Sequence, residues 1–93
     1  MGNNIYMVNK KMVSIEKISD LLNNCKMIID LDVFKEGSKI ILKILADSGS
    51  AKYTVFKERD MNDFLLDLKS HLKHNKTKTD IDLLLEDLAE WED

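Results

Sequence analysis

Few residues in this sequence are of the types that carry out enzyme chemistry, and the spacing of those residues argues against most catalytic or metal sites. His71 and His74 are three residues apart, a helical spacing at which two imidazoles can share a metal ion. Local spacing supplies no third ligand, so we predict that they bind no metal. Asp30 and Asp32 are two apart on a predicted strand, where paired carboxylates can serve as general acid and base. Because the predicted strand pairing places Lys43 opposite Asp30, we interpret both carboxylates as surface charges.

The lone cysteine, Cys25, falls at the end of a helical stripe of apolar residues, where a cysteine usually behaves as a small buried hydrophobe. One cysteine excludes an internal disulfide and a cysteine-based zinc cluster. The chain has 3 glycines, two of them needed by turns, which leaves no material for a glycine-rich phosphate loop. We therefore expect no catalytic residue, no metal and no cofactor, and we predict that the protein is not an enzyme.

The length and composition favour one globular domain, residues 1–93. A chain of 93 residues is too short for two domains, and its contents of 44% hydrophobic and 33% charged residues are ordinary for a folded protein. No apolar run approaches the roughly 18 residues of a membrane span, and the N-terminus lacks a signal-peptide pattern. We expect a cytoplasmic protein.

A helix is predicted over about 14–24, where Ser14 precedes apolar residues at helical spacing. From Lys26 the period changes to two, and three runs predict strands at 26–34, 38–46 and 50–57. A glycine turn separates each pair of runs, so an antiparallel meander is expected.

The two turns predict which residues share a face of the sheet. With Glu36-Gly37 and Ser48-Gly49 as the central pairs of tight hairpins, one face becomes a core. Its expected members are Ile29, Leu31, Val33, Ile40, Leu42, Ile44, Tyr53 and Val55. The second face pairs Asp30 with Lys43, but it also carries much apolar surface, which something is expected to cover. Its apolar residues are Ile28, Phe34, Ile41, Leu45 and Phe56.

Two more helices are predicted, over about 60–74 and 79–91, with Asp60 and Thr79 as their N-caps. The fold class is therefore α+β: a two-layer sandwich of a helix, a three-stranded antiparallel meander and two helices. Two points stay open. The last helix either packs on the core or stands away as an arm, and residues 5–8 form either a fourth strand on the sheet edge or a strap over the second face.

Charge is divided unevenly along the chain. Residues 1–76 carry a net charge of +3, and residues 77–93 carry −6. The element order is shared by double-stranded RNA-binding domains, but those domains place lysines at the start of the helix after the sheet, where residues 57–63 here include three acids. We expect no direct binding of nucleic acid and no membrane binding. The acidic segment 79–93 is instead predicted to contact a protein, through Asp80, Asp82, Glu86, Asp87 and Glu90.

The element order, with its acidic C-terminal helix, resembles that of small phage-encoded anti-CRISPR inhibitors. The resemblance implies an inhibitor from a phage or mobile element that places acidic side chains in a basic groove of an effector nuclease. On this hypothesis the protein is a non-catalytic protein-binding module.

Two alternatives remain. An antitoxin-like or regulatory protein would use the apolar stripe of the last helix as a partner-wrapping arm, with Leu83 and Leu66 as additional contacts. A homodimer of structural role would associate through the second sheet face and bury Phe34, Ile41 and Phe56.

Overall fold

The computed structural model describes residues 2–91, with side chains described from residue 11 onward. In this part of the chain the elements are the helix α1 (Gly2–Asn24), the strands β1 (Ile28–Glu36), β2 (Lys39–Ala46) and β3 (Gly49–Val55), and the helices α2 (Glu58–Ser70) and α3 (Asn75–Glu90). The strands form an antiparallel meander in the order β1-β2-β3. The predicted α+β class and element order are confirmed.

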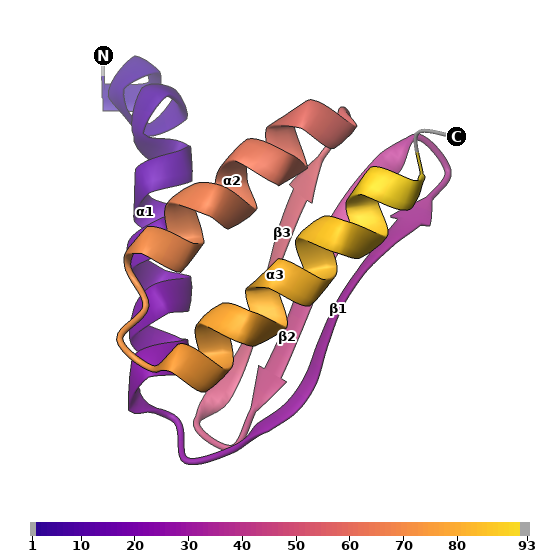
Figure 1. Ribbon diagram of the computed structural model, residues 1–93. Coiled ribbons are helices and arrows are strands. Elements are labelled where there is room, and N and C mark those ends of the chain that lie inside the picture. Colours follow the sequence, from indigo (N-terminus) through magenta and orange to yellow (C-terminus); the bar gives the residue numbers. More distant parts are fainter. Residues whose placement is uncertain (1, 92–93) are drawn as a thin grey trace.

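The helices form one layer and the sheet forms the other. Figure 1 shows α1 beside β3, α2 across the middle of the sheet and α3 along β1, all on the same side of the sheet. The core lies between the layers and includes the fully buried Phe64, on which the partly buried Tyr53 stacks with ring centroids 3.7 Å apart and planes inclined by 11°. α3 contributes Ile81, Leu84 and Leu88 to this core, so it packs on the sheet and does not stand away as an arm.

The first helix is much longer than predicted. α1 begins at Gly2, so Ser14 lies inside the helix and not at its N-cap, and residues 5–8 are helical. Neither the fourth strand nor the strap predicted for residues 5–8 is present among the described residues. Residues 3–24 contain no glycine or proline, so the sequence holds no strong helix breaker ahead of Ser14.

Both hairpin turns lie one position away from their predicted centres. Gly37-Ser38 and Asp47-Ser48 are the two-residue turns, closed by the pairs Glu36 with Lys39 and Ala46 with Gly49. Gly37, the first central residue of its turn, has φ of +65°. The tight turns of β-hairpins require a positive φ at this position, which glycine adopts readily. The strand pairing is thereby offset by two residues, and because the side-chain period is two, residues keep their predicted faces.

Two adjacent residues, Ile28 and Ile29, depart from their predicted faces because β1 has a bulge. Ile28 is opposite Ala46 whereas Asp30 is opposite Leu45, so Ile29 is the extra residue. The predictions for this pair were therefore wrong in both directions. Ile28 packs against the core and Ile29 is 58% exposed. The bulge adjoins the start of the strand, where the Asp47 carboxylate accepts a hydrogen bond from the Lys26 amide at 3.0 Å.

Both later helices begin before their predicted N-caps. α2 begins at Glu58, so Asp60 lies within its first turn, and α3 begins at Asn75, four residues before Thr79. The Thr79 hydroxyl donates to the Asn75 carbonyl at 3.0 Å, a bond made inside the helix and not at a cap.

The short link between these helices is held by α1. The Asn23 side-chain amide donates to the His71 carbonyl at 3.1 Å, and its oxygen accepts from the Lys73 amide at 2.9 Å. α2 therefore ends at Ser70, before the predicted residue 74, and the chain turns directly into α3. This link sets the place at which α3 begins to run beside β1.

Candidate protein-binding groove

The acidic residues of α3 do not share one surface. Asp82 faces α2, where its Oδ1 lies 2.7 Å from Lys69 Nζ. Asp80 and Asp87 lie on the other side of the helix, together with Leu83, and line a groove toward β1. Glu86 and Glu90 are exposed and are not among the groove-lining residues. The helix thus presents two of its predicted contact carboxylates and one exposed apolar residue, Leu83, to a single concave surface.

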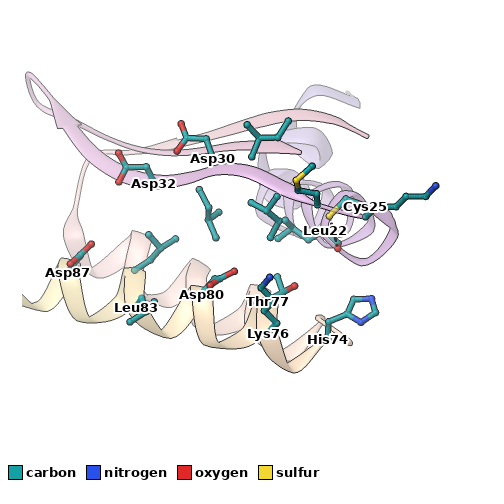
Figure 2. Close-up of a pocket in the computed structure, with 16 residues that line it drawn as sticks. Leu22, Cys25, Asp30, Asp32, His74, Lys76, Thr77, Asp80, Leu83 and Asp87 are labelled. Carbon is teal, nitrogen blue, oxygen red and sulfur yellow. Dashed lines mark hydrogen bonds between the residues drawn. The ribbon is translucent and has the colours of Figure 1, made fainter. Parts of the chain in front are cut away.

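This groove, called the acidic groove below, lies between α3 and β1 and has a volume of about 860 Å³. Its helix wall includes Lys76, Asp80, Leu83 and Asp87, and its strand wall consists of residues 25–32. Figure 2 shows Asp80 and Asp87 pointing from α3 toward β1, whereas Asp30 and Asp32 stand on the side of β1 that faces away from α3. Carboxylates therefore flank the β1 edge from both sides.

The charge of the groove is mainly negative. Four aspartates and two lysines line it, and one aspartate, Asp30, is paired with Lys43 on β2 at 3.5 Å. That ion pair was predicted, but it is diagonal, because Lys43 is directly opposite Asp32. Among the ion pairs found within the described residues, none involves Asp32, Asp80 or Asp87. Three carboxylates at the groove are thus available to a cationic partner.

The groove also has apolar contact surface. Leu83 on α3 is 54% exposed, and Ile29, exposed by the bulge, lies on the opposite wall with Met27. The groove therefore combines exposed large apolar side chains with carboxylates in one surface.

Lys35 fixes the spacing of α3 and β1 at the C-terminal end of α3. Lys35 on β1 places its Nζ 3.1 Å from Glu58 Oε2 at the start of α2. The same ammonium lies 5.3 Å from the centroid of the Trp91 ring, at the end of α3. A cation over an aromatic face is attractive, so Lys35 links the edge strand to both later helices.

The outer face of the sheet is the second apolar surface. Among residues 2–91, no helix lies on this side (Figure 1). Ile41, on the central strand, is nevertheless only 4% exposed, because its neighbours Phe34 and Thr54 flank it on the adjacent strands. Phe56 is 67% exposed and Leu45 is also exposed. Of the predicted contacts on this face, Phe56 is accessible, Phe34 is half-buried and Ile41 is covered.

Of the residues considered for catalysis or metal binding, Cys25, Asp30, Asp32 and His74 line the acidic groove, whereas His71 does not. The His71 ring nitrogen Nδ1 is 2.8 Å from the Asp67 carbonyl, and the His74 ring nitrogen Nε2 is 3.3 Å from the Asn23 carbonyl. In the part of the chain that the structure describes, no three residues with histidine, cysteine, aspartate or glutamate side chains are grouped to hold a metal ion. Cys25 is half-buried at one end of the groove, where its thiol donates to the Leu22 carbonyl.

The groups with shifted pKa values lie outside the groove. A hydrogen bond to Asp67 raises the pKa of Lys11, whose Nζ is 2.7 Å from the carboxylate. Burial raises the pKa of the Tyr53 phenol. The Lys11 pair joins α1 to α2, and Tyr53 packs against the core, so both shifts arise from the packing of the fold and do not indicate a reactive site.

The sequence pattern missed the strand half of the groove. It assigned Asp80, Leu83 and Asp87 to a contact surface, but it treated Asp30 and Asp32 as separate surface charges. Only the packing of α3 beside β1 brings the two sets together. One signal was available, because the first strand of a three-stranded meander is an edge strand, so the carboxylates on it lie near a sheet edge.

No helix in the described residues has the length and apolar character required to cross a membrane. Comparisons of the chain with protein-family models, with curated proteins and with solved structures gave no match.

Proposed function

We propose that this protein is a non-catalytic protein-binding module whose acidic groove receives a basic segment of a partner protein. The observation that carries this proposal is the arrangement of Asp32, Asp80 and Asp87 around exposed aliphatic residues in one concave surface. The carboxylates attract and orient a cationic segment, and the aliphatic residues supply contact area that is removed from water on binding.

The physical role of the groove shape is to strengthen the charge interaction. Walls of low dielectric constant focus the field of the carboxylates, so a cation between α3 and β1 is attracted more strongly than one on a flat surface. Such an interaction raises the association rate and weakens with added salt.

The expected inhibitor activity is a specific form of this proposal. An inhibitor of the anti-CRISPR type would use the groove carboxylates to bind a basic segment that borders the nucleic-acid channel of an effector nuclease. An antitoxin-like protein would instead depend on the apolar stripe of α3, but Leu84 and Leu88 are committed to the core, which favours the groove over that stripe.

The test compares two double variants of α3 that change net charge equally. Asp80→Asn with Asp87→Asn removes the helix carboxylates of the groove, and Glu86→Gln with Glu90→Gln removes two exposed carboxylates outside it. Tagged proteins are used to capture partners from the native cell, and each captured protein is then purified and its affinity measured. A partner that binds the wild type and the Glu variant but not the Asp variant supports the proposal. Equal binding of both variants contradicts it.

A second candidate function, self-association through the outer sheet face, is favoured by the distribution of charge on that face. Asp30 and Asp32 lie on β1, whereas Lys43 and Lys52 lie opposite each other on β2 and β3. A surface with acid on one side and lysine on the other is self-complementary about a two-fold axis, and the exposed Phe56 supplies apolar area. Sedimentation over a range of concentrations tests this function, with Phe56→Ser as the disrupting variant and Leu66→Ser, exposed on α2, as its control. A monomer at every concentration rules it out.

A further inference from the structure

Building on the proposed function, we propose that the partner segment binds as an extended strand that pairs with β1 and extends the sheet. The segment is basic, and it places one aliphatic side chain against Leu83. The inference rests on the free edge of β1, on the walls of the acidic groove and on the charge of those walls.

The edge of β1 has unpaired backbone groups. In the described chain β1 is bonded to β2 on one side only. Glu36 and Lys39 close a two-residue turn, so each donates its backbone N–H to the C=O of the other. Along β1, residues whose N–H and C=O bond to β2 then alternate with residues whose N–H and C=O do not. Leu31 and Val33 fall at the alternate positions, which direct their N–H and C=O groups away from β2. Among the described backbone hydrogen bonds outside the regular helices and strands, none reaches either residue.

The free edge opens into the acidic groove. The groove is lined by consecutive residues of β1, including Asp30 and Leu31, whose side chains point to opposite faces of the sheet. A cavity that contacts both must run along the edge of the strand itself. An added strand about 4.8 Å from β1 would therefore lie within the groove and beside the exposed side of α3.

The walls specify the side chains of that strand. Side chains of a strand alternate between its two faces, so one set meets α3 and the other meets the Asp30 and Asp32 side. Asp80 and Asp87 are seven residues apart, or about 10 Å along a helix. Three successive helix-facing positions of a strand span about 13 Å. The side chain at the central position therefore meets Leu83, and long cationic side chains at the two outer positions reach Asp80 and Asp87. The fitting segment is thus rich in lysine or arginine on both faces.

A second copy of this chain does not fit the same edge. Antiparallel pairing of two β1 strands would bring Asp30 and Asp32 of both copies to the shared edge, and like charges across a strand pair are destabilising. Charge on an edge strand is a common means of preventing self-pairing. Asp30 and Asp32 therefore oppose self-association at the edge and favour a cationic strand.

The probe for this inference is a blocked peptide of sequence Thr-Lys-Lys-Val-Lys-Lys-Thr, added at saturating concentration in low salt. The measurement is amide hydrogen exchange resolved by residue in NMR spectra. We expect the amides of Leu31 and Val33 to exchange quickly in the free protein and at least about tenfold more slowly in the complex. The amides of Asp32 and Phe34, already bonded to β2, serve as internal controls and are protected in both states.

Two N-methylated isomers of the peptide separate strand pairing from charge attraction. Each carries the same charge, but the methyl groups block either the amides that face β1 or the alternate set. We expect one isomer to lose binding and the other to keep it. The same affinity for both isomers, or unchanged exchange at Leu31 and Val33 in a formed complex, overturns strand addition while leaving the proposed function intact.

Two other outcomes also overturn strand addition of a basic segment. The first is failure of the unmodified peptide to bind. The proposed function is then still tested by the affinity of the purified partner for the two double variants of α3. The second is protection of Leu31 and Val33 that grows with protein concentration in the absence of peptide, since it would show that the edge is occupied by a second copy.

Discussion

Lys69 Nζ on α2 lies 2.7 Å from Asp82 Oδ1 on α3, so the acidic residues of α3 lie on two different faces of the helix. Asp82 is used to hold the helices together, whereas Asp80 and Asp87 remain directed to the acidic groove. Residues that form one charged run in the sequence therefore have different roles in the fold.

Replacing Asp82 with asparagine should affect stability and not partner binding. The pair is partly exposed, so its loss should lower the free energy of unfolding by at most about 1 kcal/mol. Urea denaturation measures the first effect, and titration with the partner measures the second. Asp87→Asn is the matched control and should show the reverse, with unchanged stability and weaker binding. Loss of binding in the Asp82 variant would contradict the division of the helix.

The bulge in β1 predicts opposite outcomes at adjacent residues of the same type. Ile28→Ala removes a side chain that packs against the core and should cost about 1–3 kcal/mol of unfolding free energy. Ile29→Ala removes an exposed side chain and should change stability by less than about 0.5 kcal/mol. Equal costs for the two variants in urea denaturation would show that the bulge is absent.

The first hairpin depends on the positive φ of Gly37. Gly37→Ala should destabilise the protein by about 1–2 kcal/mol, because alanine is strained in the left-handed region. No heavy atom lies within 4 Å of the position that a Cβ would occupy, so a clash would not explain the loss. Ser38→Ala, at the other turn position, is the control for altering this turn. Thermal unfolding that shows no difference between the variants would refute the turn assignment.

The Tyr53 phenol should make the protein sensitive to alkali. Burial raises its pKa above the ordinary value of 10.0. The pKa of the phenol is higher in the folded protein than in the unfolded chain. The protein therefore keeps its full free energy of unfolding below pH 10 and loses part of it as the pH rises through the folded-state pKa. Tyr53→Phe keeps an aromatic ring for the stack on Phe64 and should lose less stability than the wild type between about pH 9 and pH 11. Parallel stability curves over this range would contradict the expected burial of the phenol.

Much of the fold was predictable from local pattern. The change from helical spacing to alternation at Lys26, together with two glycine turns, was enough to predict the meander. The face assignments of Leu31, Leu42 and Tyr53 were confirmed although both turns were misplaced, because an offset of two residues preserves the side of the sheet. The bulge was not predictable, since Ile28 and Ile29 are chemically alike and either can occupy the core position.

The helix starts were wrong because cap signals also occur inside helices. Thr79 followed by Asp82 fits the pattern of an N-terminus, yet Thr79 bonds back to the Asn75 carbonyl within α3. The groove was beyond local pattern for a different reason. It requires α3 to pack beside β1, and the order of the helices over the sheet depends on long-range contacts such as those of Asn23 with the α2–α3 link.

We expect the groove carboxylates, and not the acidic charge of α3 in general, to bind the partner. This expectation is tested most directly by the affinity of the purified partner for the two double variants at low and high salt. Asp80→Asn with Asp87→Asn should weaken binding by at least about tenfold at low salt, or about 1.4 kcal/mol, and by less at high salt. Glu86→Gln with Glu90→Gln should leave the affinity within about twofold of wild type, because those side chains lie outside the groove. Equal weakening by the two variants would contradict this expectation.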